Sequence, residues 1–179
     1  MKKIILAVTA LFLFTGCGDM SNTPTKKVED FLGKYQSMDS AVLSQLDDII
    51  KTDGEMEEDQ KTDYKSLMER QYQNLSYKIK NENIDGDRAT VETEVEVYDY
   101  RSAIDKAEEY RDKNKEEFQD KDKKDDLSKY IKYKLEELKK VNDKRKYTIT
   151  FNLHKDDGEW VLDDISDNDR EKLHGLYQE

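Results

Sequence analysis

Apolar residues after residue 23 recur three and four positions apart, which places their side chains on one face of an α-helix. This pattern predicts three helices that begin near Pro24, Ser40 and Glu57, the last of them ending near Asn74. Thr23 and Ser40 are suited to cap the first two helices, because a hydroxyl accepts a hydrogen bond from an unpaired N–H of the first turn. The predicted apolar faces are Val28, Phe31, Leu32, Tyr35 and Met38, then Val42, Leu43, Leu46, Ile49 and Ile50, then Tyr64, Leu67, Met68 and Tyr72.

The hydrophobic period then changes to two residues, which is typical of strands with one buried face. Two alternating segments separated by Asp85-Gly86 predict one hairpin, and two more separated by Asp157-Gly158 predict a second. We therefore expect an antiparallel sheet. The four predicted strands cover residues 75–80, 89–97, 147–153 and 160–165, the last with a slip in phase before Ile165.

Residues 101–143, between the two hairpins, return to a helical composition. Their first half is highly charged with few apolar residues, and opposite charges three or four positions apart support such a solvated helix. An acidic segment from Asp120 to Asp126 predicts a turn before the second half. That half has an apolar stripe of Leu127, Tyr130, Ile131, Leu135, Leu138 and Val141.

This order of elements predicts an α+β fold, in which helices cover one face of an antiparallel sheet. We expect residues 24–179 to form a single domain with N-terminal helices packed on a curved, four-stranded sheet. Residues 101–143 would be a helical insertion between strands two and three, and the tail 169–179 would add one helical turn.

The first sixteen residues have the pattern of an export signal. Lys2 and Lys3 precede an apolar run of 11 residues, 4–14. A helix needs roughly 20 residues to span a bilayer, so this run is too short to cross one. A short apolar run that follows positive charge and ends in small residues is typical of a cleaved signal peptide. We expect residues 1–16 to be removed and residues 17–23 to form a polar tether.

The segment Phe14-Thr15-Gly16-Cys17-Gly18 resembles the lipobox of bacterial lipoproteins, with Phe14 at the usual leucine position. The resemblance implies cleavage before Cys17 and attachment of two acyl chains, such as palmitate, through its sulfur. Two chains provide the stable anchoring that one chain does not. Cys17 is the one cysteine of the sequence, so no internal disulfide competes for it. The expected location is the extracytoplasmic face of the cell membrane, although Cys17 as an ordinary buried thiol is the alternative.

Charge limits the partners of the domain. Loss of Lys2 and Lys3 with the leader changes the formal net charge from −11 to −13. Nucleic acid is therefore an unfavourable partner, because phosphate binding needs a basic face. Anionic headgroups should repel the domain as well, so membrane lipid is expected to contact the protein through the lipidated N-terminus.

Three segments resemble the nuclear transport factor 2-like, or cystatin-like, roll that occurs in many small Gram-positive lipoproteins. They are the amphipathic opening Val28-Glu29-Asp30-Phe31-Leu32-Gly33-Lys34-Tyr35, the turn and strand Asp85-Gly86-Asp87-Arg88-Ala89-Thr90-Val91, and Lys155-Asp156-Asp157-Gly158-Glu159-Trp160-Val161-Leu162. The resemblance implies a curved roll with Trp160 packed beneath it. Residues 101–143 depart from the short connection usual in the family. Because the family includes enzymes and binding modules, the resemblance implies no activity.

No pattern of catalytic residues stands out. The two histidines, His154 and His174, are expected on the surface, and phosphate-binding loops are absent from the sequence. Asn81, Asn83 and Asp85, followed by Gly86 and Glu92, have the spacing of a calcium-binding EF-hand loop. Arg88 occupies a position that such a loop gives to an apolar residue, and the flanking segments alternate like strands. We prefer a hairpin turn to a metal site and expect no cofactor.

Two functions remain open at this point. The first is a non-catalytic, membrane-anchored domain that binds a protein or peptide partner or has an envelope role. The alternative is a small-molecule-binding or catalytic roll with an aromatic and acidic pocket, since tyrosines occur throughout the chain. Filling of the core by tyrosines is the preferred explanation for Tyr64, Tyr72, Tyr77, Tyr98, Tyr100, Tyr110, Tyr130, Tyr133 and Tyr147.

Overall fold

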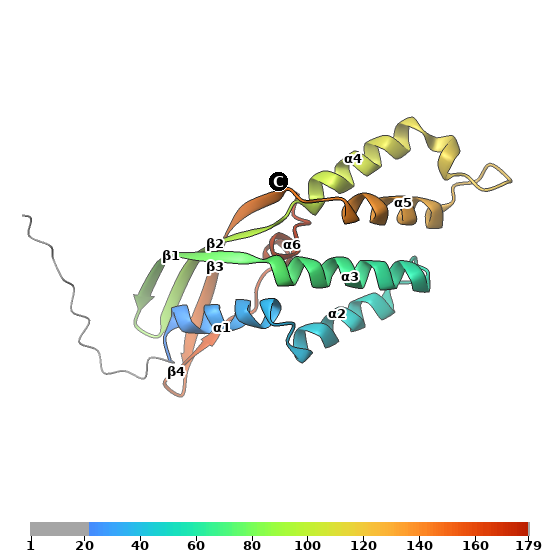
Figure 1. Ribbon diagram of the computed structural model, residues 1–179. Helices are drawn as coiled ribbons and strands as arrows, with labels where there is room; N and C mark the ends of the chain where they lie inside the picture. The colour runs from blue at the N-terminus through green and yellow to red at the C-terminus, as the bar shows by residue number, and fades with distance from the viewer. Residues whose placement is uncertain (1–21, 179) are drawn as a thin grey trace, which may run out of the picture.

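Three helices lead into the sheet in the computed structural model, which describes residues 22–178 (Figure 1). The predicted signal peptide and Cys17 lie outside the described residues. The helices are α1 (Pro24–Gln36), α2 (Ser40–Thr52) and α3 (Glu58–Asn74).

The helix starts follow from local hydrogen bonds. The N–H of Lys26 donates to the Thr23 hydroxyl at 3.1 Å, as expected for α1. The prediction for α2 was wrong by one residue, because the carboxylate of Asp39 accepts from Ala41 N–H and Ser40 is already helical. A carboxylate is as good a cap as a hydroxyl and also interacts favourably with the positive end of the helix dipole.

The sheet has four antiparallel strands in the order β1 (Ser76–Asp85), β2 (Arg88–Tyr98), β3 (Lys144–Asp156) and β4 (Glu159–Leu162). It is curved and unclosed, and the predicted α+β class and both hairpins are confirmed. Strand β1 continues beyond the predicted end at residue 80, because a bulge between Ile79 and Asn81 lets pairing resume as far as Asp85. Strand β4 ends at Leu162 rather than at the predicted Ile165, because its pairing with β3 stops there.

The first core lies between the sheet and α1. The inward residues of β2 and β3, including Val91, Val95 and Phe151, are buried against α1. Phe31 of α1 meets Phe151 edge to face, with ring centroids 5.8 Å apart. Trp160 is 6% exposed and joins this core, so the space beneath the sheet is filled by side chains.

The insertion between β2 and β3 is helical, as predicted. It consists of α4 (Tyr100–Lys113), the short 3-10 helix η1 (Lys115–Phe118) and α5 (Leu127–Lys139). These helices form a hairpin that extends past the end of the sheet beside α2 and α3 (Figure 1). A second core joins α2, α3 and α5 with Tyr100 at its base. The molecule therefore has a sheet end and a helical end.

The tail contributes more than the predicted single turn. Ser166 caps an eight-residue helix, α6 (Asp167–His174), whose Leu173 is fully buried in the first core. Gly175 ends this helix in the left-handed conformation, with φ +71°. Its carbonyl accepts a hydrogen bond from Arg101 N–H at 2.7 Å. The tail thus ties the start of α4 to the sheet end of the domain.

Candidate functional site

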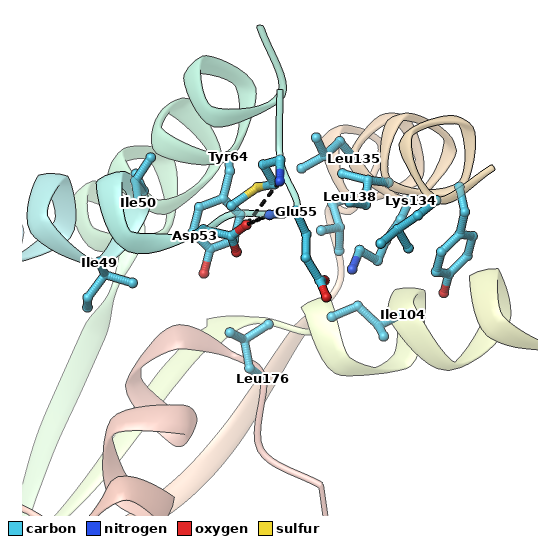
Figure 2. Close-up of a pocket in the computed structure, with 14 residues that line it drawn as sticks. Ile49, Ile50, Asp53, Glu55, Tyr64, Ile104, Lys134, Leu135, Leu138 and Leu176 are labelled. Carbon is cyan, nitrogen blue, oxygen red and sulfur yellow. Dashed lines mark hydrogen bonds between the residues drawn. The ribbon is translucent and has the colours of Figure 1, made fainter. Parts of the chain in front are cut away.

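An apolar cleft of about 400 Å³ lies at the helical end. Figure 2 shows its walls: α2 stands on one side with the connection to α3, and α4 and α5 stand on the other. We call this site the apolar cleft. Its apolar lining includes Ile49, Ile50, Met56, Tyr64, Ile104, Leu127, Ile131, Leu135, Leu138 and Leu176.

The rim of the apolar cleft exposes large apolar side chains. Ile49 is 58% exposed and Leu127 is 40% exposed, whereas the neighbouring Ile50 is buried. Ile49 belongs to the predicted apolar face of α2, but the helices opposite do not close over it. Exposed apolar groups next to a concave apolar surface are typical of an interaction site, because water solvates them poorly.

Two acidic residues border the cleft on the α2 side. The Asp53 carboxylate accepts hydrogen bonds from the backbone N–H groups of Glu55 and Met56, at 2.8 and 3.0 Å, and this shapes the turn before α3. Glu55 is exposed and reaches from that turn over the cleft (Figure 2). Among residues 22–178, no Lys or Arg lies within 4 Å of either carboxylate. This side of the rim is therefore negatively charged.

Lys134 lines the cleft from α5 on the opposite side. Its ammonium nitrogen lies 5.6 Å from the ring centroid of Tyr130, close enough for a cation–π attraction. The hydroxyl of Tyr130 is buried and has no hydrogen-bond partner within the described part of the chain. Burial raises the pKa of the Tyr130 and Tyr64 phenols, so both remain neutral.

The tyrosines do not gather in one pocket beneath the sheet. Tyr64 and Tyr130 line the apolar cleft, Tyr72 packs against α1, and Tyr147 belongs to the sheet core. Tyr110 stacks on Tyr133 near the tip of the α4–α5 hairpin, with centroids 5.0 Å apart. The apolar cleft thus lies between helices rather than inside a roll.

The two histidines differ from each other. His154 lies on the outer face of the sheet, half-exposed, with Nδ1 2.5 Å from an Asp163 carboxylate oxygen. His174 is not the surface residue that was predicted: its Nε2 lies 3.2 Å from the Tyr72 hydroxyl, and burial lowers its pKa to about 4. The spacing of Leu173 and Leu176 around it was the sequence signal for a packed tail. Neither histidine lines the apolar cleft.

The segment with EF-hand spacing is a hairpin. Asn81, Asn83 and Asp85 lie in β1 and Glu92 lies in β2, whereas an EF-hand needs helices on both sides of its loop. Gly86 supplies the left-handed turn between them, with φ +59°. Within residues 22–178 no group of three or more His, Cys, Asp or Glu side chains is placed to hold a metal ion.

The described helices include none that is both long and apolar enough to span a membrane. No family model matches the chain, and no curated protein matches it. The chain is similar to the crystal structure of a "putative lipoprotein (ycdA)" from Bacillus subtilis subsp. subtilis str. 168, with 22% sequence identity and a TM-score of 0.42. The match covers 87% of this chain and 47% of the other, so the chain spans about half the length of that protein.

Proposed function

We propose that this chain is an extracytoplasmic lipoprotein, anchored in the cell membrane through lipid on Cys17, whose domain is a non-catalytic binding module. The leader and the lipobox-like segment support the anchor. The apolar cleft supports a binding role, because it exposes Ile49 and Leu127 beside a cavity that a partner could fill. A protein or peptide is the proposed partner.

The point at which the chain enters the domain favours a cleft that is accessible to a partner rather than held against the membrane. The Asn22 side chain donates to Gly158 O at 3.2 Å and accepts from Trp160 N–H at 2.9 Å, so the chain enters the domain at the β3–β4 turn. Five residues of chain from Cys17 reach at most about 18 Å, so the lipid would hold the sheet end near the bilayer. Helices α2 and α5, which line much of the apolar cleft, extend toward the opposite end of the domain (Figure 1). The apolar cleft would therefore face away from the membrane.

Replacement of Cys17 with serine tests the anchor. We expect Cys17→Ser to move the protein from the membrane fraction into the medium or to leave the leader uncleaved, because serine offers no sulfur for acylation. Cell fractionation and intact-mass spectrometry measure both outcomes. An unchanged membrane fraction with an unacylated Cys17 would contradict the proposed anchor.

The binding role is tested with the neutral apolar dye Nile red. The chain from residue 17 onward with Cys17→Ser is used without detergent, after its cooperative unfolding has been verified. We expect the dye to bind, and the double change Ile49→Ser and Leu127→Ser to weaken its binding about tenfold through lost apolar contact. Ile84→Ser is the matched control, because Ile84 is 51% exposed on β1, away from the cleft. Equal binding by both variants would exclude the apolar cleft as the site.

A further inference from the structure

The α2 side of the apolar cleft has a strong excess of negative charge. Residues 39–57 include six acidic side chains and one lysine. Asp47 lies 2.6 Å from Lys65, and Asp48 lies 3.9 Å from Lys51. The rim carboxylates of Asp53 and Glu55 have no such cationic partner among the described residues. The lining of the cleft therefore has a net negative charge as well as exposed apolar side chains.

The opposite side of the cleft carries one cation against these two carboxylates. Lys134 is the cation of the lining, and its ammonium group lies over the ring of Tyr130 on α5. No carboxylate lies within 4 Å of it in the described part of the chain. The apolar cleft is thus asymmetric, with an acidic rim on α2 and an apolar interior.

We propose that the apolar cleft is the docking site for a cationic amphipathic segment of a partner protein, an inference that rests on the proposed binding role. Apolar side chains of the segment would fill the cavity beside Ile49 and Leu127. Lys or Arg side chains on its flank would pair with Asp53 and Glu55. An amphipathic helix presents this combination, with apolar anchors three and four residues apart and charges beside them.

The net charge of the chain also favours such an occupant. The formal net charge of −13 without the leader attracts a cationic partner over a distance and repels an anionic one. An anionic lipid surface, in contrast, would be repelled by the acidic rim.

The probe is the fluorescently labelled synthetic peptide LKKLLKLLKKLLKL, compared with its acidic counterpart LEELLELLEELLEL. Fluorescence anisotropy is measured with the same Cys17→Ser chain at low ionic strength. We expect the cationic peptide to bind at least tenfold more tightly than the acidic one. Ile49→Ser should weaken its binding severalfold, whereas Ile84→Ser should not.

Two charge-reversal variants distinguish binding at the acidic rim from attraction by the net charge of the whole domain. Glu55→Lys is expected to weaken binding of the cationic peptide about fivefold, the effect of replacing one rim ion pair by a repulsion. Glu92→Lys changes the net charge equally on the outer face of β2 and is expected to change affinity less than twofold. Equal effects of the two reversals, or equal binding of both peptides, would overturn the inference.

The experiments with Nile red and with the peptides test the binding role and the cationic occupant separately. If Nile red binding depends on Ile49 and Leu127 but neither peptide binds, the binding role stands and the cationic occupant is wrong. Sedimentation velocity tests a second copy of the chain as the occupant. A dimer that Ile49→Ser dissociates, and that the cationic peptide does not displace, would also overturn the proposal.

Discussion

Replacement of Gly175 with alanine is expected to lower the melting temperature by roughly 10 °C. Gly175 has φ +71°, where an L side chain costs about 1–2 kcal/mol. A Cβ atom there would also overlap the carbonyl oxygen of Tyr98 and approach Gln71 Nε2 to 2.5 Å. Forced overlap of this kind adds about 1–3 kcal/mol. The backbone of β2 cannot move aside easily, because Gln71 holds both the N–H and the carbonyl of Tyr98.

Gly86→Ala is the matched control for this change. Gly86 has φ +59°, and a Cβ atom there would meet nothing within 4 Å. It should therefore cost only the backbone strain, about 1 kcal/mol, and lower the melting temperature by about 3 °C. Thermal unfolding followed by circular dichroism measures both variants. Equal shifts would contradict the prediction, because they would show that the tail and β2 accommodate the added Cβ atom at little cost.

Acid is expected to destabilise the domain through His174 well before most carboxylates are protonated. Burial lowers the pKa of His174 from 6.5 to about 4, and the positive charge of Arg170 acts in the same direction. Between these two pH values the unfolded chain binds a proton that the folded chain does not. The free energy of unfolding therefore decreases as the pH falls. The loss is about 2 kcal/mol from pH 7 to pH 5 and about 3 kcal/mol near pH 4.

His174→Gln isolates this contribution, because the amide can still reach the Tyr72 hydroxyl but does not titrate. The free energy of unfolding is measured in urea at pH 7 and at pH 5. Between these pH values the wild type should lose about 2 kcal/mol more stability than the variant does. A constant difference would mean that the imidazole is solvated in the folded protein. The carboxylates of the domain titrate alike in both proteins, so their contributions to the pH dependence of stability cancel in the comparison.

The apolar cleft could be anticipated only in part. Its lining comes from the apolar stripes of α2 and α5, and both stripes were visible as helical spacing. The spacing does not say which members of a stripe lose contact with water. Ile50 is buried and Ile49 is exposed, although they are adjacent and equally apolar. Ile104 and Leu176 join the lining from α4 and the tail, segments whose sparse apolar residues gave little signal.

Local physical chemistry was sufficient to predict most of the fold. Helical and strand periods depend on contacts between residues only a few positions apart, and so do turns such as Asp85-Gly86. The sequence by itself therefore determined the helices, the hairpins and the α+β class. The lipobox-like segment around Cys17 is likewise a local signal, and the anchor that it implies stays a prediction.

Only the tertiary structure decided where these elements leave space and where they close it. It packed the partly buried His174 against Tyr72, gave Gly175 no room for a side chain, and placed the apolar cleft between helices rather than beneath the sheet. These outcomes depend on packing between residues about 70 to 100 positions apart in the chain. A hydrophobic pattern states that a side chain will seek apolar neighbours, but the neighbours are chosen by how whole helices and strands fit together.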